Sequence, residues 1–234
     1  MDNFSKSSQV TIIPARGGSK GIKAKNVQEV NGITLVERAI KSAQKIKENL
    51  IIVSSDDKKI LNLARTSNVI SHQRSEINSS DSASSESVVL EILNDYNLRD
   101  VIVTLLQVTS PFIDVKAWQQ SIDKLKERDD LGSIFSASIK NVFQWEFTNR
   151  WSPINHSKYF RELRQNRSLG ATETGAFYIF KSELFKAEQT RFCGITEPVE
   201  TSIWSSFDID TLEDLEFCQK IGSIFDSEFD SDVI

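Results

Sequence analysis

The chain has 234 residues, of which 39% are hydrophobic, and its formal net charge is −5. This length and apolar fraction suffice for one sizeable core, whereas the negative charge argues against a surface that binds nucleic acid or anionic lipid. The two cysteines and two histidines lack the spacing of a disulfide framework or a zinc site, which predicts a reduced protein. Because the N-terminal residues lack a signal-peptide core and no apolar run has membrane-spanning length, we expect a cytoplasmic location.

Short apolar runs alternate with longer amphipathic stretches, which is typical of an α/β fold with a mainly parallel sheet. Helices are predicted where apolar residues recur three or four positions apart, and strands where the runs are short. In chain order the pattern predicts strand 10–15, helix 34–47, strand 50–53, helix 57–67, helix 84–98, strand 101–106, helix 115–126, strand 131–139 and helix 211–225. The last helix has Thr211 as its expected N-cap, with Asp214 in the capping-box position.

The domain organisation follows from the same pattern. We expect residues 1–8 to be disordered, 9–225 to form a single domain, and 226–234 to be a solvated acidic tail. The segment from about 140 to 168 is rich in aromatic residues, Asn and Arg, has no helical period, and is interpreted as a β-hairpin excursion from the main sheet. Ligands of open α/β sheets bind at the carboxyl ends of the strands, so polar clusters after each strand are the candidate site.

A glycine-rich loop at 14–21 follows the first predicted strand. Arg16, Lys20, Lys23 and Lys25 place four cations in ten residues of an otherwise acidic chain. Such a cluster matches the charge of a nucleoside triphosphate, and the glycines let backbone N–H groups approach one oxygen cluster. The loop fits neither the Walker A pattern nor the dinucleotide fingerprint. Its alternative interpretation is a solvated basic turn.

Two aspartates, Asp208 and Asp210, lie just before the last predicted helix. If this stretch is extended, residues two positions apart project from the same face. Two carboxylates together with triphosphate oxygens and water would satisfy Mg²⁺, which favours octahedral oxygen ligation. The alternative is that both are cap and turn residues.

In this order, the motifs resemble those of the CMP-sialic acid synthetase (acylneuraminate cytidylyltransferase) family. The resemblance rests on the following stretches: Ile12–Gly21, Lys25-Asn26, Ser54–Asp56, Arg74, Ser80–Ser85, Leu105–Pro111, Arg164-Gln165, Thr174–Ala176 and Phe207–Thr211. It implies a three-layer α/β fold, a mainly parallel twisted sheet of the Rossmann-like nucleotidyltransferase type, with a small β-rich dimerisation excursion.

The resemblance also implies an activity, transfer of CMP from CTP onto a sialic-acid-like 2-keto sugar acid. It implies Mg²⁺, with Mn²⁺ as the alternative metal, and a homodimer. The implied catalytic residues are Arg16, Lys25 and Asp210, and the implied metal ligands are Asp208 and Asp210. The implied nucleotide-binding residues are Ala15, Arg16, Gly17, Gly18, Ser19, Lys25, Asn26, Arg74, Ala83, Ser84 and Ser85, and the implied sugar-binding residues are Gln107 and Arg164.

Several alternatives stay open. The family pattern is not followed at 172–174, and the segment 139–145 lacks the usual His-Pro-x-Lys motif, for which Lys140 is a candidate substitute. The acceptor could therefore be N-acetylneuraminate, Kdn, legionaminate, pseudaminate or Kdo, and a non-catalytic nucleotide sensor is the alternative from another class. Ser84 and Ser85 could equally cap a helix. His72 and His156 are expected to be structural.

Overall fold

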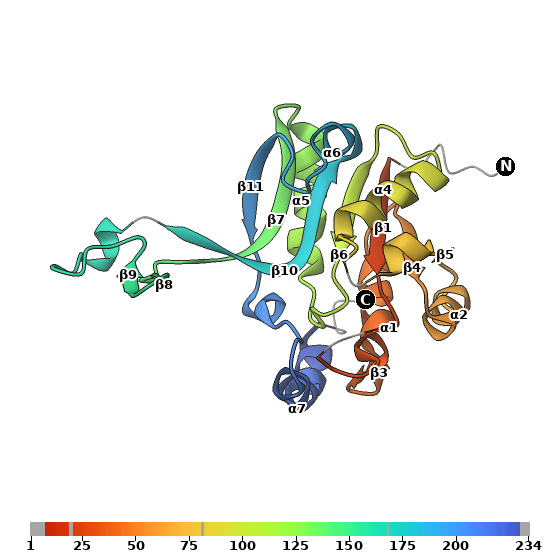
Figure 1. Ribbon diagram of the computed structural model, residues 1–234, viewed down its shortest axis with the longest axis horizontal. Coiled ribbons are helices and arrows are strands. Elements are labelled where there is room, and N and C mark those ends of the chain that lie inside the picture. Colours follow the sequence, from red (N-terminus) through yellow and green to blue (C-terminus); the bar gives the residue numbers. More distant parts are fainter. Residues whose placement is uncertain (1–7, 19–20, 81, 168, 230–234) are drawn as a thin grey trace.

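The computed structural model describes residues 8–18, 21–80, 82–167 and 169–229. Its centre is a seven-stranded sheet in the order β11-β7-β10-β6-β1-β4-β5 (Figure 1). The strands are β1 (Gln9–Pro14), β4 (Leu50–Ser55), β5 (Ile70–Gln73), β6 (Ile102–Leu106), β7 (Leu131–Lys140), β10 (Gly170–Lys181) and β11 (Ile195–Glu200). The neighbours β1, β4, β5 and β6 pair in parallel, as do β7 and β11, and β10 runs antiparallel to both β6 and β7. The predicted mainly parallel sheet is confirmed.

Helices and small elements complete the described chain. The α-helices are α1 (Leu35–Gln44), α2 (Lys58–Thr66), α3 (Glu76–Ser79), α4 (Ser85–Asp95), α5 (Val115–Glu127), α6 (Ser182–Glu188) and α7 (Leu212–Phe229). The 3₁₀-helices are η2 (Lys25–Val27), η3 (Arg164–Asn166) and η4 (Ile203–Ser206). Two further hairpins pair β2 (Glu29–Val30) with β3 (Ile33–Thr34) and β8 (Trp145–Phe147) with β9 (Trp151–Pro153).

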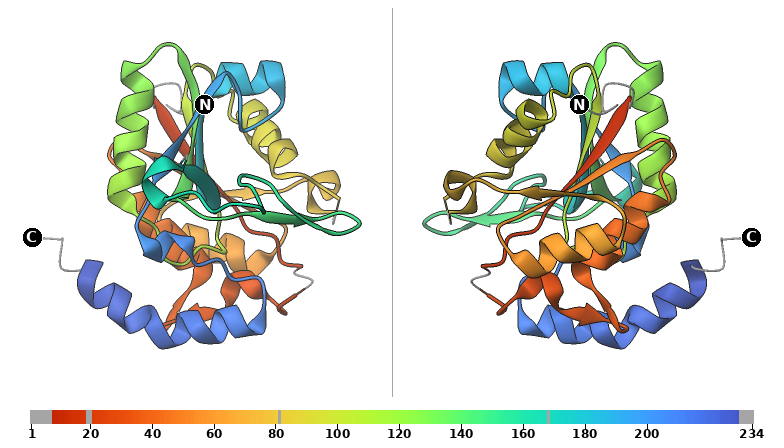
Figure 2. Two further views of the ribbon diagram at one scale, coloured as in Figure 1. Left: turned by 90° about the vertical axis from the view of Figure 1, so that its left-hand side faces the viewer. Right: turned by 90° about the vertical axis from the view of Figure 1, so that its right-hand side faces the viewer.

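The helices form a layer on each face of the sheet because successive strand residues point to opposite sides. Ile13 of β1 belongs to the core shared with α1, α2, α5 and α7, whereas its neighbour Ile12 belongs to the core shared with α4 and α6. Both side chains are fully buried. The three predicted layers are therefore present, and α7 runs across one end of the molecule beside α1 (Figure 2).

Local capping fixes where the helices begin. Thr34 and Glu37 form a reciprocal capping box at the start of α1. Ser84 accepts from the N–H of Ser87 at 3.0 Å at the start of α4. The N–H of Thr211 donates to Asp214 at 2.8 Å, and the N–H of Asp214 donates back to the Thr211 hydroxyl at 3.2 Å. The predicted capping box of the last helix is confirmed.

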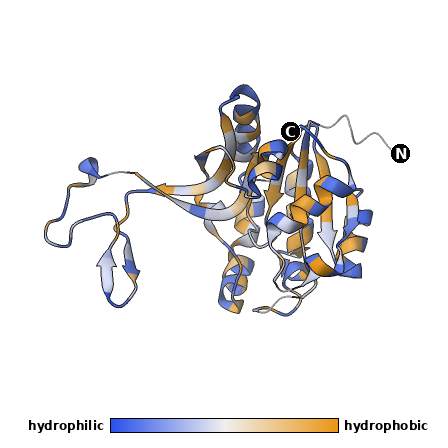
Figure 3. Ribbon diagram, turned by 45° about the horizontal axis from the view of Figure 1, so that its top comes forward, coloured by the Kyte–Doolittle hydropathy of each residue, from blue (hydrophilic) through white to orange (hydrophobic). Residues whose placement is uncertain are grey.

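The segment between β7 and β10 projects away from the sheet as an arm, residues 141–167 (Figure 1). It carries the hairpin β8–β9, as predicted for this segment. Figure 3 shows how polar much of its ribbon is compared with the central sheet, but several large apolar side chains of the arm are exposed. These are Trp145, Phe147, Trp151, Ile154, Tyr159, Phe160 and Leu163.

The C-terminal prediction needs a correction. The solvated tail was expected from residue 226, but α7 continues to Phe229 and Asp226 forms an ion pair with Arg38 of α1. The Arg38 side chain is buried, and its ion pair with Asp226 ties the last turns of α7 to α1. Residues 230–234 and the N-terminal 1–7 lie outside the described chain. None of the helices in the described part has the length and apolarity needed to cross a membrane.

Candidate active site

The loop after β1 is fastened to the end of β4. The N–H of Ala15 donates to the Ser54 carbonyl at 2.9 Å, and the N–H of Gly17 donates to Asp56 Oδ1 at 2.8 Å. A side chain at Gly17 would collide with Asp57, since its Cβ would lie 2.8 Å from that of Asp57. The N–H groups of Ala15 and Gly17 are thus hydrogen-bonded within the protein, and the expectation that the N–H groups at the glycines face one ligand stays a prediction.

The loop also meets the aspartate pair across a short gap. Lys25 Nζ donates to the Ile209 carbonyl at 2.8 Å and to Asp210 Oδ1 at 3.1 Å. The backbones approach so closely that a Cβ at Gly21 would lie 2.7 Å from the Asp210 carbonyl oxygen. The N–H of Ile209 donates to the Thr109 carbonyl at 2.9 Å, which fastens the pair to the loop after β6. Residues nearly 200 positions apart thus form one site.

The two aspartates differ in exposure. The Asp210 side chain is 74% exposed and faces Lys25, whereas Asp208 is half-buried. Burial, with the negative charge of Asp210 added, raises the pKa of Asp208 above its ordinary value. Within the described part of the chain, Asp208 Oδ1 is buried and has no hydrogen-bond partner. A buried carboxylate oxygen without a donor is suited to a cation, so the pair fits the hard oxygen ligation that Mg²⁺ prefers.

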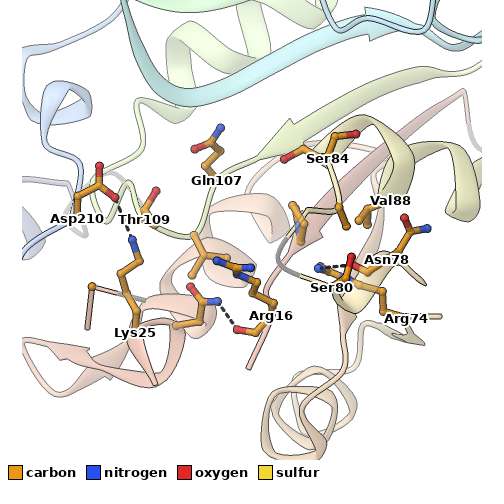
Figure 4. Close-up of a pocket in the computed structure, with 16 residues that line it drawn as sticks. Arg16, Lys25, Arg74, Asn78, Ser80, Ser84, Val88, Gln107, Thr109 and Asp210 are labelled. Carbon is orange, nitrogen blue, oxygen red and sulfur yellow. Dashed lines mark hydrogen bonds and ion pairs between the residues drawn. The ribbon is translucent and has the colours of Figure 1, made fainter. Parts of the chain in front are cut away.

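A cavity of about 440 Å³ opens between the loop, the start of α4 and the loop after β6 (Figure 4). In Figure 4 Arg16 lies between Lys25 on one side and Arg74 on the other. The residues that line it are Pro14, Arg16, Gly21, Lys25, Asn26, Arg74, Asn78, Ser80, Ala83, Ser84, Ser85, Val88, Gln107, Val108, Thr109 and Asp210. Three cations and the N-terminus of α4 give this cavity a positive potential suited to an anion.

Two cavity side chains are held by backbone carbonyls. Asn26 donates from Nδ2 to the Arg16 carbonyl at 2.8 Å. Arg74 donates from Nη2 to the Ser54 carbonyl at 2.9 Å and is buried. Burial, with the nearby Arg16 charge added, lowers the pKa of Arg74, while Asp56 and Glu91 oppose that shift. The side chains are thereby positioned before any ligand arrives.

A second cavity of about 590 Å³ lies beside the first, and Gln107 lines both. The N–H of Gln107 donates to the Ala176 carbonyl at 3.1 Å, and the positive φ of 76° at Gly175 turns β10 next to it. The second cavity is lined by Gln107, Ser138, Lys140, Val142, Thr172, Glu173, Thr174, Gly175, Tyr178, Ser206 and Asp208. The aspartate pair stands at the junction, since Asp210 lines the first cavity and Asp208 the second.

Most of the predicted site residues come together in these two cavities. Those lining the first are Arg16, Lys25, Asn26, Arg74, Ala83, Ser84, Ser85, Gln107 and Asp210. Ala15 is fully buried and, with Gly17 and Gly18, does not line the cavity. Ser19 lies outside the described residues, as does the side chain of Arg164. Sequence reasoning missed Asn78, which lies on the short helix α3, and Thr109, which lies within the stretch Leu105–Pro111 but was not assigned to the site. Local periodicity does not show which polar side chain of such a stretch faces a cavity.

The fold is shared with solved structures. The chain superposes on a CMP:2-keto-3-deoxy-manno-octonic acid synthetase complexed with CTP, with a TM-score of 0.68 at 18% identity, covering 93% of this chain and 99% of that one. A 4-diphosphocytidyl-2C-methyl-D-erythritol synthase from Anaerococcus prevotii gives a TM-score of 0.66 at 15% identity, covering 92% and 96%. These similarities define the class as the Rossmann-like nucleotidyltransferase fold.

Residues 10–228 match the cytidylyltransferase family, and the chain belongs to that family. It is 32% identical over 181 residues to N-acylneuraminate cytidylyltransferase A of Danio rerio, covering 75% of this chain and 42% of the relative. It is 28% identical over 219 residues to the pseudaminic acid cytidylyltransferase of Campylobacter jejuni, covering 89% and 93%. The chain thus spans less than half the length of the Danio rerio relative and nearly all of the Campylobacter jejuni relative.

Proposed function

We propose that this chain transfers CMP from CTP to a hydroxyl of a sialic-acid-like 2-keto sugar acid and releases pyrophosphate. The observation that carries the proposal is the contact of Lys25 with Asp210, which closes a cationic nucleotide cavity against a carboxylate pair. The family and the names of its relatives support the reaction type. The adjoining cavity, which shares Gln107, supports a second substrate next to the nucleotide.

In the proposed reaction the anomeric hydroxyl oxygen of the acid attacks the α-phosphorus of CTP in line. A new O–P bond forms, the bond from the α-phosphorus to the bridging oxygen breaks, and the electron pair leaves with pyrophosphate. Arg16 and Lys25 neutralise the charge that builds on the leaving group. A carboxylate of the aspartate pair takes the hydroxyl proton, and Asp208 is the one that borders the acceptor cavity.

Asp208 and Asp210 are the proposed holders of Mg²⁺, with Mn²⁺ as the alternative. When bound, such an ion supplies positive charge to the phosphate oxygens. The fit rests on the unpartnered Oδ1 of Asp208 and the exposed carboxylate of Asp210. The remaining work of the chain is positioning, which dominates phosphoryl-type transfer.

The acceptor is proposed to enter the second cavity, with Gln107 at the junction. Lys140 lines this cavity and supplies a cation for the acceptor carboxylate, which supports it as the substitute for the missing family lysine. The carboxylate role proposed for Arg164 concerns a side chain outside the described residues. Neuraminate, pseudaminate, legionaminate, Kdn and Kdo remain the candidate acceptors.

The decisive experiment measures pyrophosphate release from CTP and Mg²⁺ with each candidate acid in turn. We expect release that depends on both CTP and one of the acids, with the CMP-sugar as co-product. Binding of CTP without release for any acid would instead support a nucleotide sensor. No binding of CTP would refute the proposed function.

We further propose that the protein is a cytoplasmic homodimer. The exposed apolar side chains of the arm support a subunit interface.

The cytoplasmic location is supported by the two cysteines, which are buried and free in the described chain. Burial raises the pKa of both thiols to about 11, which keeps them in the unreactive thiol form.

A further inference from the structure

Behind the nucleotide cavity, two buried polar residues that the proposed reaction does not use, Ser54 and His72, form a hydrogen-bonded network with Arg74 of the cavity wall. Ser54, at the end of β4, holds Arg74 through two bonds, one from Nη2 to its carbonyl at 2.9 Å and one from Nε to its hydroxyl at 3.3 Å. Ser54 is fully buried and does not line the cavity, whereas Arg74 does. The orientation of the Ser54 hydroxyl therefore bears on how the guanidinium is presented.

That hydroxyl faces a histidine on the neighbouring strand. Ser54 and His72 are register partners of the parallel pair β4–β5, and Nδ1 of the imidazole lies 3.0 Å from the Ser54 oxygen. The other ring nitrogen, Nε2, lies 3.0 Å from Asp95 Oδ2 at the end of α4. His72 is 6% exposed, and its ring meets the edge of Tyr96 with a centroid distance of 5.9 Å.

Counting the hydrogens shows which atom donates and which accepts in each hydrogen bond of this network. The Nε–H of Arg74 can only donate, so the Ser54 oxygen accepts from it. The single hydroxyl hydrogen of Ser54 is then free to donate to Nδ1 of His72. With Nδ1 as acceptor, the ring hydrogen of the neutral imidazole is on Nε2, where it donates to the carboxylate of Asp95. In this arrangement each hydrogen bond of the network, from Arg74 through Ser54 and His72 to Asp95, has one donor and one acceptor.

An alternative role for His72 and Asp95 is to bind a metal ion together with Glu91. Ligand atoms of His72, Glu91 and Asp95 lie within 4.8 Å of one another. However, Glu91 already accepts from the Ser75 N–H and from Asn78, and both ring nitrogens of His72 are hydrogen-bonded. A cation bound to His72 would have to displace one of these two ring-nitrogen bonds, and the hydrogen-bond network accounts for the cluster without a metal.

We propose that His72, braced by Asp95, is a positioning residue for nucleotide binding. It orients the Ser54 hydroxyl so that the Arg74 guanidinium is fixed toward the cavity. This inference rests on the proposed function, because Arg74 lines the cavity that is proposed to bind CTP. The physical advantage is preorganisation, since a guanidinium fixed before binding loses less side-chain freedom when the ligand arrives.

Two substitutions of His72 separate this role from mere core filling. In His72→Asn the amide oxygen takes nearly the place of Nδ1 and can still accept from Ser54. In His72→Gln the amide nitrogen takes nearly the place of Nε2 and can reach Asp95, but the acceptor for Ser54 is lost. Both remove the ring, and loss of packing alone would affect His72→Asn, which has the smaller side chain, at least as much as His72→Gln.

The experiment is calorimetric titration with CTP and Mg²⁺ in the absence of any sugar acid. We expect His72→Gln and Ser54→Ala to raise the Kd for CTP about three- to tenfold, the value of one net hydrogen bond. His72→Asn should stay within about twofold of the wild type on the same reasoning. In turnover assays the KM for CTP should rise in His72→Gln, while kcat and the KM for the acid stay unchanged.

Equal Kd values for His72→Asn and His72→Gln would overturn the proposal, as would a His72→Gln value equal to that of the wild type. If both His72 variants fail to fold, the Ser54→Ala variant tests the proposal instead, and a Kd for CTP equal to that of the wild type would overturn it. Failure of the proposed function looks different, because the wild-type chain would then bind no CTP or would bind it without releasing pyrophosphate with any acid.

Discussion

At the scale of single residues, Asp208 combines a cost to folding with a proposed use. Its half-buried carboxylate has an oxygen, Oδ1, without a hydrogen-bond partner among the described residues. Without a cation, burying such a group is unfavourable. With a cation, the same oxygen becomes a ligand. This exchange of stability for function is typical of active sites.

We therefore expect Asp208→Asn to unfold at a higher temperature than the wild type without metal, by roughly 2–4 °C for about 1 kcal/mol. The variant should lose turnover and should lose the further stabilisation that Mg²⁺ and CTP give the wild type. Thermal unfolding with and without both ligands measures this. Asp129→Asn, an exposed residue outside both cavities, is the control. An Asp208→Asn protein that keeps the Mg²⁺-dependent shift would remove Asp208 from the metal site.

Arg16 stands at the centre of the nucleotide cavity in Figure 4. Removing one preorganised positive group that is proposed to face the leaving pyrophosphate should raise the barrier by about 2–4 kcal/mol. We expect Arg16→Ala to lower kcat/KM accordingly in a pyrophosphate-release assay. The matched control is Arg65→Ala on α2, whose guanidinium donates to Ser71 outside the cavity. An unchanged kcat/KM in Arg16→Ala would contradict its assigned role.

At the scale of elements, Arg38 joins three parts of the fold. It leaves α1, donates from Nε to the Pro111 carbonyl at 3.2 Å in the loop after β6, and pairs with Asp226 of α7. Its guanidinium also lies 5.5 Å from the centroid of Phe112. Since the Pro111 loop continues from Gln107 and Thr109, and α7 begins after Asp210, this side chain ties together two walls of the site.

We expect the ion pair between Arg38 and Asp226 to make the docking of α7 dependent on pH. Burial acts to raise the pKa of Asp226, but hydrogen bonds from Arg38 and Asn31 outweigh it, so the folded pKa lies below the ordinary value. A depressed carboxyl pKa stabilises the fold above the unfolded value of about 4, and this stabilisation is lost as the pH falls through the folded pKa.

Asp226→Asn should therefore melt below the wild type at neutral pH, and the difference should shrink as the pH falls below about 4. Melting temperatures across that range measure the effect. Glu216→Gln, exposed on the same helix, is the control and should show no such convergence. A difference that is constant with pH would mean that the ion pair does not contribute.

At the scale of the whole molecule, the arm is the feature that a single chain does not explain. Its hairpin residues Phe147 and Trp151 are 62% and 66% exposed, although large aromatic side chains are normally buried. Their rings pair with each other at a centroid distance of 5.4 Å and cover little of one another. A second copy of the chain is the partner proposed above.

We expect the wild type to sediment as a dimer at micromolar concentration and the double variant Phe147→Ser/Trp151→Ser to sediment as a monomer, because the apolar contact area is lost. Ile224→Ser, which changes an exposed apolar residue on α7 instead of the arm, should remain dimeric. A wild type that is strictly monomeric would refute the proposed interface.

Much of the secondary structure followed from local pattern. The helices α1, α2, α4, α5 and α7 and the strands β1, β4, β6 and β7 lie within a few residues of their predicted bounds, because each has a clear period or a continuous apolar run. The missed elements lack that signal. β5 has four residues and is partly polar, α6 has seven, and β10 is interrupted near Gly175 by a shift of register. β11 contains Pro198, which only an edge strand tolerates.

The sequence by itself determined the α/β pattern, the cationic loop and the spacing of Asp208 and Asp210, because these depend on neighbours along the chain. Only the tertiary structure decided that Lys25 meets Asp210, that the N–H of Gly17 is taken by Asp56, and that His72 stands behind Arg74. Such contacts arise from the order in which strands assemble into the sheet. That order depends on packing of the whole core, for which no short stretch of sequence carries a signal.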